Sequence, residues 1–316
     1  MRKVLVAVDG TSKGLDMVSV LGRLLKERKD VKVVLFHCVQ QLTSLLPEDL
    51  CMDVVESCKL PCDAQERLGQ AVLKASTERL TEAGVPQGDI ELRLKIDSVD
   101  PARDIIEQAT MEGARTIAVG RRGRSQVETL LLGSVSAKVA QYAEGKVVWV
   151  VDAPVNDSMS VLIAMEGTPE ARALCDYTAE FFVPCSGLGY SFLHVIPPLP
   201  PEFWDDGHIL NESEQKERDG RVEKWRTDWT ATVERYMTEG RDILAQSGAD
   251  PQKMESLILR TREGVARDIL TEIEAHKFRI VVMGRKSSRE KKPFPLGSRA
   301  SKILQHSRGV ILCLVG

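Results

Sequence analysis

The sequence predicts an α/β protein made of two doubly wound, five-stranded parallel-sheet domains in tandem, paired through their last strands. Three observations support this fold class. The chain has 316 residues, about the length of two ordinary domains. Its two halves repeat one another. Within each half, short apolar runs alternate with segments of helical period, which is the pattern of βα units that form a parallel sheet.

The internal repeat predicts the domain organisation. Gly120 and Gly133 in the first half are 13 residues apart, as are Gly284 and Gly297 in the second. Three further segments match in order along the chain: residues 4–11 with 161–168, 35–39 with 192–196, and 101–106 with 265–270. We place the boundary just after Pro154, which gives domains at residues 1–155 and 156–316.

In the first half, strands are predicted near residues 3–8, 31–39, 91–96, 115–119 and 146–151. Apolar residues between them recur at helical spacing, first at Leu15, Val18, Leu21 and Leu25, then at Leu68, Ala71 and Ala75. Pro101 suits the first position of the next helix, and Gly113 lies just past its end. Since crossovers between parallel strands are right-handed, five such strands form a doubly wound, Rossmann-like sheet whose ligands bind outside the strands' carboxyl ends.

In the second half, strands are predicted near residues 160–165, 188–196, 255–260, 279–283 and 309–315. An insertion follows the second of these strands. Residues 197–201 are proline-rich and extended, and a stripe at helical spacing comes after them at Val222, Trp225, Trp229, Val233 and Met237. We interpret this stripe as the core-facing side of a helix, with a platform for a partner or ligand as the alternative.

The last strand of each half is strongly apolar, at residues 146–151 and 310–315. Each strand alone would leave an apolar edge with unpaired backbone groups, which natural sheets avoid exposing. We therefore predict that the two strands pair and make an internal pseudo-dimer. A further homodimer stays open.

Composition excludes several classes of protein. Lys and Arg total 43 against 46 Asp and Glu, and this net charge of −3 gives no case for a nucleic-acid partner. No apolar run approaches the roughly 18 residues that would span a membrane, and the apolar run after Met1 is too short for a signal peptide. Seven cysteines, an odd number, are scattered through the chain. We expect a reduced, cytoplasmic protein.

The candidate site lies in a glycine-rich segment of the first half. Gly120 ends the fourth predicted strand, Gly123 follows, and after nine more residues Gly133 and Ser134 open the last helix. Glycines allow close approach to the backbone, while helix-terminal N–H groups and the hydroxyls of Ser134 and Ser136 can hold phosphate oxygens. The alternative is ordinary turn chemistry, with Ser134 as an N-cap. The chain has neither a Walker A sequence nor a G-x-G-x-x-G after the first strand.

This motif, G-x2-G-x9-G-S, together with Asp9 at the end of the first strand, resembles the ATP-binding pattern of the universal stress proteins. The resemblance covers both halves. It implies a stress-response protein that binds an adenine nucleotide, with ATP and Mg²⁺ as the expected cofactors. It also implies that the backbone of Cys38 meets the adenine edge. The nucleotide-binding residues that it implies are Asp9, Cys38, Gly120, Gly123, Gly133, Ser134, Val135 and Ser136.

The second half departs from the pattern. Glu166 stands in place of the aspartate, and Ser287 replaces the second glycine, which adds a Cβ where close approach is needed. The weaker candidates for a second nucleotide site are Glu166, Gly284, Gly297 and Ser298. A degenerate, purely structural site is the alternative. The basic run at residues 285–292 is interpreted as a solvated loop, with phosphate attraction as the alternative.

Other polar groups give no catalytic constellation. The spacing of Cys51, Cys58 and Cys62 does not suit zinc, although a redox role stays open. His37 and His194 occupy equivalent positions, which indicates a shared structural hydrogen bond. Arginines at 121, 122 and 124 offer positive charge near the phosphates, but no water-activating base accompanies them.

The leading functional hypothesis is a cytoplasmic stress-response protein whose first domain binds ATP with Mg²⁺ as a switch ligand. The alternative is an interaction scaffold that binds no nucleotide and acts through protein partners. No catalytic residue is assigned. Slow ATP hydrolysis or autophosphorylation stays open, because a Mg²⁺-bound triphosphate beside Ser134 and Ser136 is reactive in principle.

Overall fold

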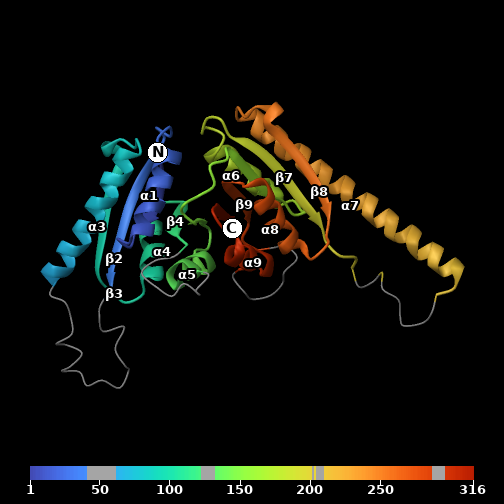
Figure 1. The fold of residues 1–316 in the computed structure, drawn as a ribbon, viewed down its shortest axis with the longest axis horizontal. Coiled ribbons are helices and arrows are strands. Elements are labelled where there is room, and N and C mark those ends of the chain that lie inside the picture. Colours follow the sequence, from blue (N-terminus) through green and yellow to red (C-terminus); the bar gives the residue numbers. More distant parts are fainter. Residues whose placement is uncertain (41–61, 122–131, 201–202, 204–209, 287–295) are drawn as a thin grey trace, which may run out of the picture. The chain divides into compact units, whose positions relative to one another are not determined.

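The computed structural model describes residues 1–40, 62–121, 132–200, 203, 210–286 and 296–316. The chain divides into two compact units (Figure 1). Unit 1 comprises Met1–Asp157 together with Leu296 and Leu304–Gly316. Unit 2 comprises the described part of Ser158–Pro293 together with Gly297–Ile303. The boundary predicted between residues 155 and 156 stays a prediction.

Unit 1 is an α/β sandwich around a twisted sheet with strand order β3-β2-β1-β4-β5-β10. Its strands are β1 (Arg2–Ala7), β2 (Val31–Gln40), β3 (Ile90–Ser98), β4 (Thr116–Gly120), β5 (Val147–Val151) and β10 (Ile311–Val315). The first five are parallel, which confirms the predicted doubly wound sheet. The helices are α1 (Ser12–Leu25), α3 (Cys62–Glu82), α4 (Pro101–Met111) and α5 (Ser134–Tyr142), with a 3-10 turn, η2 (Gln87–Asp89), before β3.

The sixth strand of this sheet comes from the end of the chain. β10 pairs antiparallel with β5, with Leu312 opposite Val150 and Cys313 opposite Trp149. All residues of both strands are buried. The predicted pairing of the two last strands is therefore confirmed, and it covers the apolar edge that each strand would otherwise expose.

Local sequence signals explain the helix boundaries of unit 1. The side chain of Asp100 caps α4 by accepting from the N–H of Ala102, and Pro101 follows at the first helical position, as predicted. Gly113 adopts a positive φ of 64° just past the end of the same helix. The apolar stripe predicted for α3 is wrong, since Leu68 is 44% exposed.

The buried face of α3 includes Gln65, Leu73, Ser76 and Leu80 instead. Two of these residues are polar, so the hydrophobic pattern did not identify the face. Both have hydrogen bonds that make burial tolerable: Ser76 donates to the carbonyl of Val72, and Gln65 donates to Asp97.

Unit 2 repeats the arrangement with four parallel strands in the order β9-β6-β7-β8. They are β6 (Ser160–Ala164), β7 (Gly189–Ile196), β8 (Met254–Arg260) and β9 (Ile280–Gly284). The helices are α6 (Ala171–Phe181), α7 (Glu212–Gln246), α8 (Val265–His276) and α9 (Ser298–His306), and η4 (Pro251–Lys253) precedes β8. The fifth strand predicted for the second half exists as β10, and it belongs to unit 1.

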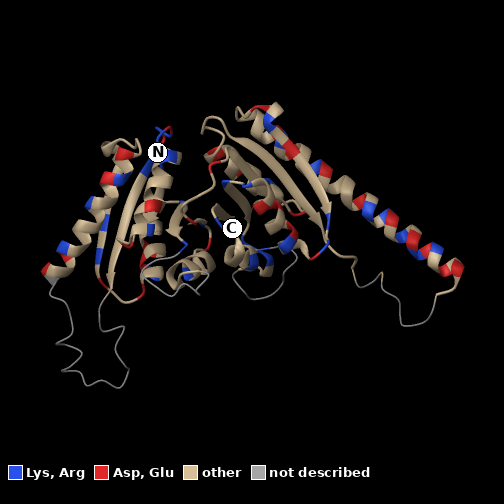
Figure 2. Ribbon diagram, viewed as in Figure 1, with Lys and Arg blue, Asp and Glu red and all other residues tan. Residues whose placement is uncertain are grey.

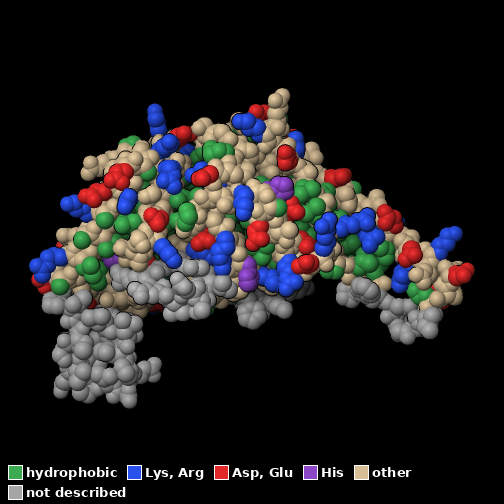
Figure 3. Space-filling view, in the orientation of Figure 1, with side chains coloured by type: hydrophobic (Ala, Val, Ile, Leu, Met, Phe, Trp, Pro, Cys, Tyr) green, Lys and Arg blue, Asp and Glu red, His purple; other side chains and the backbone are tan. Residues whose placement is uncertain are grey.

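The inserted helix α7 is 35 residues long and runs along β8 and beyond its end (Figure 1). Asn211 and Glu214 form a capping box at its start. Val222, Val233 and Met237 are buried, which confirms the helix-core interpretation for these members of the stripe. Both signs of charge alternate along its exposed surface (Figure 2), and they are also interspersed over the face of the molecule seen in Figure 3. Among the described helices, none is both long and apolar enough to cross a bilayer.

Close packing of α1 on the end of α3 generates the first prediction. A Cβ at Gly22 would lie 2.5 Å from the Cβ of Ala83, so Gly22→Ala should lower the free energy of unfolding by about 1–3 kcal/mol. Helix propensity alone would favour alanine by up to about 1 kcal/mol. The sign of the change in unfolding free energy therefore tests whether Gly22 packs closely against Ala83. Chemical denaturation followed by circular dichroism measures it.

Two controls accompany this variant. Gly220→Ala in α7 adds a Cβ with no atom within 4 Å and should stabilise slightly. Gly22→Ala combined with Ala83→Gly should recover most of the loss, because the clashing methyl group is removed. Equal stabilisation by both single glycine substitutions would contradict the close contact.

Candidate functional site

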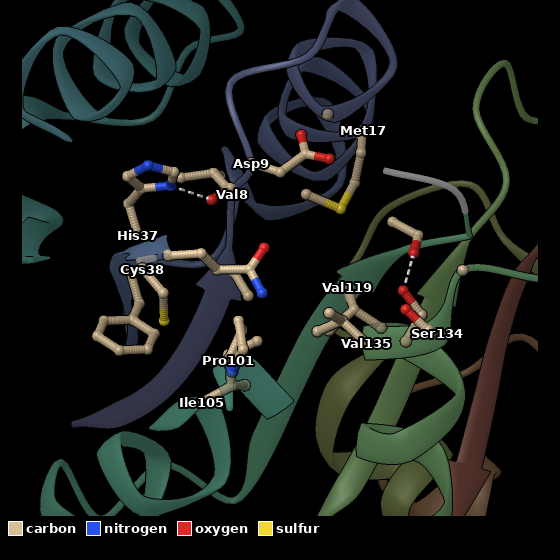
Figure 4. Close-up of a pocket in the computed structure, with 17 residues that line it drawn as sticks. Val8, Asp9, Met17, His37, Cys38, Pro101, Ile105, Val119, Ser134 and Val135 are labelled. Carbon is tan, nitrogen blue, oxygen red and sulfur yellow. Dashed lines mark hydrogen bonds between the residues drawn. The ribbon is translucent and has the colours of Figure 1, made fainter. Parts of the chain in front are cut away.

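Unit 1 contains a cavity of about 260 Å³ at the carboxyl ends of β1, β2 and β4, which we call the first cavity (Figure 4). This is where a doubly wound sheet places its ligands. Its lining consists of Ala7, Val8, Asp9, Gly14, Met17, Phe36, His37, Cys38, Gln40, Pro101, Ile105, Val119, Gly120, Gly133, Ser134, Val135 and Ser136. The structure thus brings together the predicted residues Asp9, Cys38, Gly120, Gly133, Ser134, Val135 and Ser136, while Gly123 lies outside the described residues.

Asp9 is held in place by the turn that follows β1. Its Oδ1 accepts hydrogen bonds from the N–H of Thr11 at 3.0 Å and from the Thr11 hydroxyl at 2.8 Å. The same hydroxyl caps α1 by accepting from the N–H of Gly14. A Cβ at Gly14 would come within 2.3 Å of Asp9 Oδ1, so a glycine is needed there. Sequence reasoning missed Gly14, which carries no motif signal of its own.

The start of α5 forms the opposite side of the first cavity. Gly133 is the N-cap residue and no side chain caps the helix, so the alternative assignment of Ser134 as N-cap is wrong. Ser134 is instead the first helical residue and is exposed. The first N–H groups of a helix have no acceptor within the helix, and the positive end of its dipole adds to their attraction for anions. The N–H groups of Ser134, Val135 and Ser136 are therefore suited to hold an anion.

One of the two predicted hydroxyls has a different role. Ser136 is buried, and its hydroxyl donates to the carbonyl of Gly120 at 2.5 Å. A hydroxyl has a single proton, so Ser136 cannot also donate to a phosphate oxygen. The N–H of Gly133 likewise donates to the carbonyl of Arg121 at 2.8 Å. These two bonds fasten the start of α5 to the end of β4, and only Ser134 retains a hydroxyl that can serve a ligand.

Arg121 points away from the first cavity, contrary to expectation. Its side chain is buried, and Nη2 donates to the carbonyls of Leu304 at 2.7 Å and Gln305 at 2.6 Å near the end of α9. The carboxylate of Asp152 lies 3.9 Å from its Nε. A cation at the carboxyl end of a helix satisfies terminal carbonyls and opposes the helix dipole. Arg121 therefore has a structural role, while residues 122 and 124 lie outside the described residues.

A buried histidine joins the first two strands in each unit. Nδ1 of His37 donates to the carbonyl of Val8 at 2.6 Å (Figure 4), and Nδ1 of His194 donates to that of Met165 at 2.9 Å. The predicted shared hydrogen-bonding role is confirmed. Because a carbonyl only accepts, the proton lies on Nδ1 in both rings.

The neighbouring thiol of Cys38 lines the first cavity. Burial, reinforced by the carboxylate of Asp104, raises the pKa of this thiol to about 12. The thiol is consequently protonated at neutral pH and does not act as a nucleophile. Of the other cysteines predicted as a cluster, Cys51 and Cys58 lie outside the described residues and Cys62 begins α3.

Unit 2 has a smaller cavity at the equivalent place, about 50 Å³, which we call the second cavity. Of the weaker candidates, Glu166, Gly284 and Gly297 line it. Ser298 begins α9, between the lining residues Gly297 and Arg299. The replacement of glycine by Ser287 lies outside the described residues.

Side chains of unit 2 fill the second cavity. The indole Nε1 of Trp229, from α7, donates to Nε2 of His194 at 2.9 Å. Nη1 of Arg299 lies 3.2 Å from a carboxylate oxygen of Glu166. Sequence reasoning missed both of these contacts. The repeat does align Arg299 with Val135, so the sequence shows a long cationic side chain where the first half has a small apolar one.

The sequence model of the universal stress protein family matches residues 1–151 and again residues 158–313. The chain belongs to the universal stress protein family. Its relatives include the universal stress protein YxiE of Bacillus subtilis (strain 168), 28% identical over 148 residues that cover 44% of this chain and 91% of YxiE. A universal stress protein of Mycolicibacterium smegmatis (strain ATCC 700084 / mc(2)155) is 28% identical over 189 residues, covering 56% of this chain and 60% of the relative.

A likeness of fold covers nearly the whole chain. A crystal structure of a universal stress protein from Archaeoglobus fulgidus DSM 4304 matches with a TM-score of 0.63 and 20% identity. The match covers 99% of this chain and 98% of that one. The predicted tandem of two such domains is therefore confirmed, and the chain is a stress-response protein of this family.

The closure of the second cavity in this universal stress protein gives the second prediction. Trp229→Phe removes the indole donor to the buried His194 and should destabilise the fold by about 1–3 kcal/mol. Trp225→Phe, a half-buried neighbour in the same helix, is the matched control and should cost less than about 1 kcal/mol. Chemical denaturation followed by circular dichroism measures both. Equal losses would show that the indole hydrogen bond contributes nothing measurable.

Proposed function

We propose that unit 1 binds ATP with Mg²⁺ and that the nucleotide acts as a switch ligand rather than a rapidly consumed substrate. One observation carries this proposal. Seven of the eight residues predicted from the motif line a single cavity that ends at the start of a helix. The first cavity combines an apolar space with the N–H groups at the start of α5, and that combination suits a nucleotide.

The chemistry of the lining supports a division of the nucleotide between two parts of the site. Met17, Ile105 and Val119 offer apolar contact, and the strand-end backbone near Cys38 offers hydrogen bonds to a base edge. At about 260 Å³, the enclosed space is slightly below the usual range of roughly 300–1,000 Å³ for ligand pockets. We infer that it takes the nucleoside and that the phosphates extend along the start of α5.

Asp9 and Ser134 are the groups that suit a Mg²⁺–triphosphate. Mg²⁺ prefers oxygen ligands and is usually held by one or two carboxylates together with phosphates and water. The Asp9 carboxylate is oriented by Thr11, and the Ser134 hydroxyl is not used for capping. When bound, Mg²⁺ would neutralise phosphate charge. In this proposal Asp9 orients the hydrated ion and the N–H groups at the start of α5 hold the phosphate oxygens.

The same residues argue for slow turnover. Acceleration requires groups that act more strongly on the transition state than on the bound nucleotide. Arg121, the described arginine of the motif, is committed to the carbonyls of Leu304 and Gln305. The Ser136 hydroxyl is committed to Gly120. The groups that remain, Asp9, Ser134 and the N–H groups at the start of α5, are suited to binding the nucleotide rather than to hydrolysing it.

The scaffold alternative is favoured for unit 2 by one observation. The indole of Trp229 and the Arg299–Glu166 ion pair fill the second cavity. We propose that residues 156–316 serve as a domain that works without nucleotide and that residues 1–155 contain the nucleotide site.

The third prediction introduces into unit 1 an equivalent of the Arg299–Glu166 ion pair of unit 2. Val135→Arg places a guanidinium beside Asp9, as Arg299 lies beside Glu166, and should weaken ATP binding by at least about tenfold. Lys138→Arg, an exposed change on the same helix, should leave affinity unchanged. Isothermal titration with Mg²⁺ and ATP measures both. Wild-type affinity in the folded Val135→Arg protein would refute the assignment of the first cavity.

A fourth prediction concerns turnover. Purified protein with Mg²⁺ and ATP should release phosphate well below the roughly 1 per second at the lower end of ordinary enzymes. ATP should nevertheless raise the melting temperature in a concentration-dependent way, because it binds the folded state. Phosphate release and thermal unfolding are measured on the same sample. Sustained turnover above that rate, lost in Asp9→Ala, would identify an ATPase instead.

A further inference from the structure

Unit 2 has another groove, which lies at the opposite end of its strands from the second cavity. It lies at the amino ends of β6, β7 and β8, beside the last turns of α8, and has a volume of about 360 Å³. We call it the α8 groove. It is lined by Ser160, Leu162, Gly189, Tyr190, Ser191, Phe192, Leu193, Lys253, Glu255, Leu257, Glu272, His276 and Phe278. None of these residues takes part in the proposed nucleotide site.

The corresponding place in unit 1 is filled by a network of ion pairs. Lys3 Nζ lies 2.9 Å from Glu91 and 2.7 Å from Glu112. Arg93 contacts the same two glutamates, at 2.8 and 2.5 Å, and Lys32 lies 3.8 Å from Glu91. These contacts raise the pKa of Lys3 and lower the pKa of both glutamates. Cationic side chains thus occupy this position in the first repeat.

Strand register fixes which residues of unit 2 stand at these positions. Lys3 pairs with Lys32 across β1 and β2, as Ser160 pairs with Gly189 across β6 and β7. Val34 pairs with Glu91, as Ser191 pairs with Glu255.

The remaining correspondences follow from the next strand and helix. Arg93 stands opposite Phe36, and Leu257 stands opposite the equivalent Leu193. On the helix, Glu112 corresponds to His276. The next residues, Gly113 and Lys277, both have positive φ, 64° and 53°, which confirms this alignment.

Unit 2 has therefore lost all three cations of the network and kept one of its two carboxylates. Lys3, Lys32 and Arg93 are replaced by Ser160, Gly189 and Leu257, in that order. Glu255 retains the position of Glu91, and Glu272 adds a carboxylate one turn before His276, with which it makes a 3.3 Å contact.

Two glutamates against one lysine leave the α8 groove with a formal charge of −1 when His276 is counted as neutral. Within the described part of the chain, neither Glu255 nor Glu272 forms an ion pair with a lysine or arginine. Lys253 stands where unit 1 has Asp89, at the end of the turn before β8. The removal of three long side chains explains why the groove is open, and the carboxylates of Glu255 and Glu272 explain its negative charge.

We propose that the α8 groove binds a linear alkylammonium cation of the polyamine class. An ammonium group takes the place that Lys3 occupies in unit 1 and is held by Glu255 and Glu272. The alkyl chain lies on the apolar floor formed by Leu193, Leu257 and Phe278. Leu257 is 39% exposed, so covering it removes apolar surface from water and adds to the electrostatic attraction.

Spermidine is the probe for the first experiment, titrated calorimetrically into the full chain without nucleotide. One molecule should bind per chain. Glu255→Gln and Glu272→Gln should each weaken binding by about tenfold, because each removes one charged partner of the ammonium. Glu274→Gln, an exposed glutamate on the same helix that does not line the groove, is the matched control and should bind as the wild type does.

A double variant tests whether the missing cations are what leaves the α8 groove open to a ligand. Ser160→Lys combined with Leu257→Arg restores two of the three cations of unit 1, those of Lys3 and Arg93, and should abolish spermidine binding without lowering the melting temperature. An arginine-containing peptide, titrated in parallel, should bind more weakly than spermidine, because the group whose place the ligand takes in unit 1 is the alkylammonium of Lys3. Circular dichroism verifies that each variant is folded.

Three results would overturn the proposal: no binding of spermidine to the wild type, equal binding by Glu255→Gln and Glu274→Gln, or tighter binding of the peptide. The assay contains no ATP, so its outcome is independent of the nucleotide site in unit 1.

Discussion

The attachment of α5 to the end of β4 is the contact on which the first cavity depends. Ser136 donates to Gly120, and Gly133 donates to Arg121, so the first turn of the helix cannot move away from the strand. The N–H groups that follow are thereby held at the rim of the sheet, where the fold places its ligands. In unit 2, Gly297 makes the equivalent bond to Arg285 at 2.9 Å, but Ala300 stands where Ser136 would donate.

The two repeats share a strand order but differ in which end of their parallel strands is filled by side chains. Small side chains such as Val135 keep the carboxyl end of the sheet open in unit 1, whereas Arg299 and Trp229 close it in unit 2. At the amino end the relation is reversed, because Lys3 and its partners fill unit 1 and Ser160 leaves unit 2 open. The first cavity of unit 1 and the α8 groove of unit 2 therefore lie at opposite ends of the parallel strands.

Much of the fold could be predicted because it depends on local periodicity and on the repeat. The parallel strands, the start of α4 at Pro101 and the pairing of β5 with β10 all followed from apolar runs and turn residues. The stripe of α3 could not be predicted correctly, since its buried face includes Gln65 and Ser76, whose burial depends on hydrogen bonds formed only in the folded chain. The motif predicted which residues meet at the first cavity. It could not predict that Arg121 turns toward α9, because that contact joins residues 183 apart.

The position of β10 has a consequence for how the chain acquires its structure during synthesis. β10 is the edge partner of β5 in unit 1, yet it lies at residues 311–315. The sheet of unit 1 is thus incomplete until residues 311–315 have left the ribosome, although domains generally fold in order from the amino terminus. Until then the apolar edge of β5 is available to other chains. The two halves of this protein therefore cannot mature one after the other as independent modules, and the nascent first half depends on the second for its protection from aggregation.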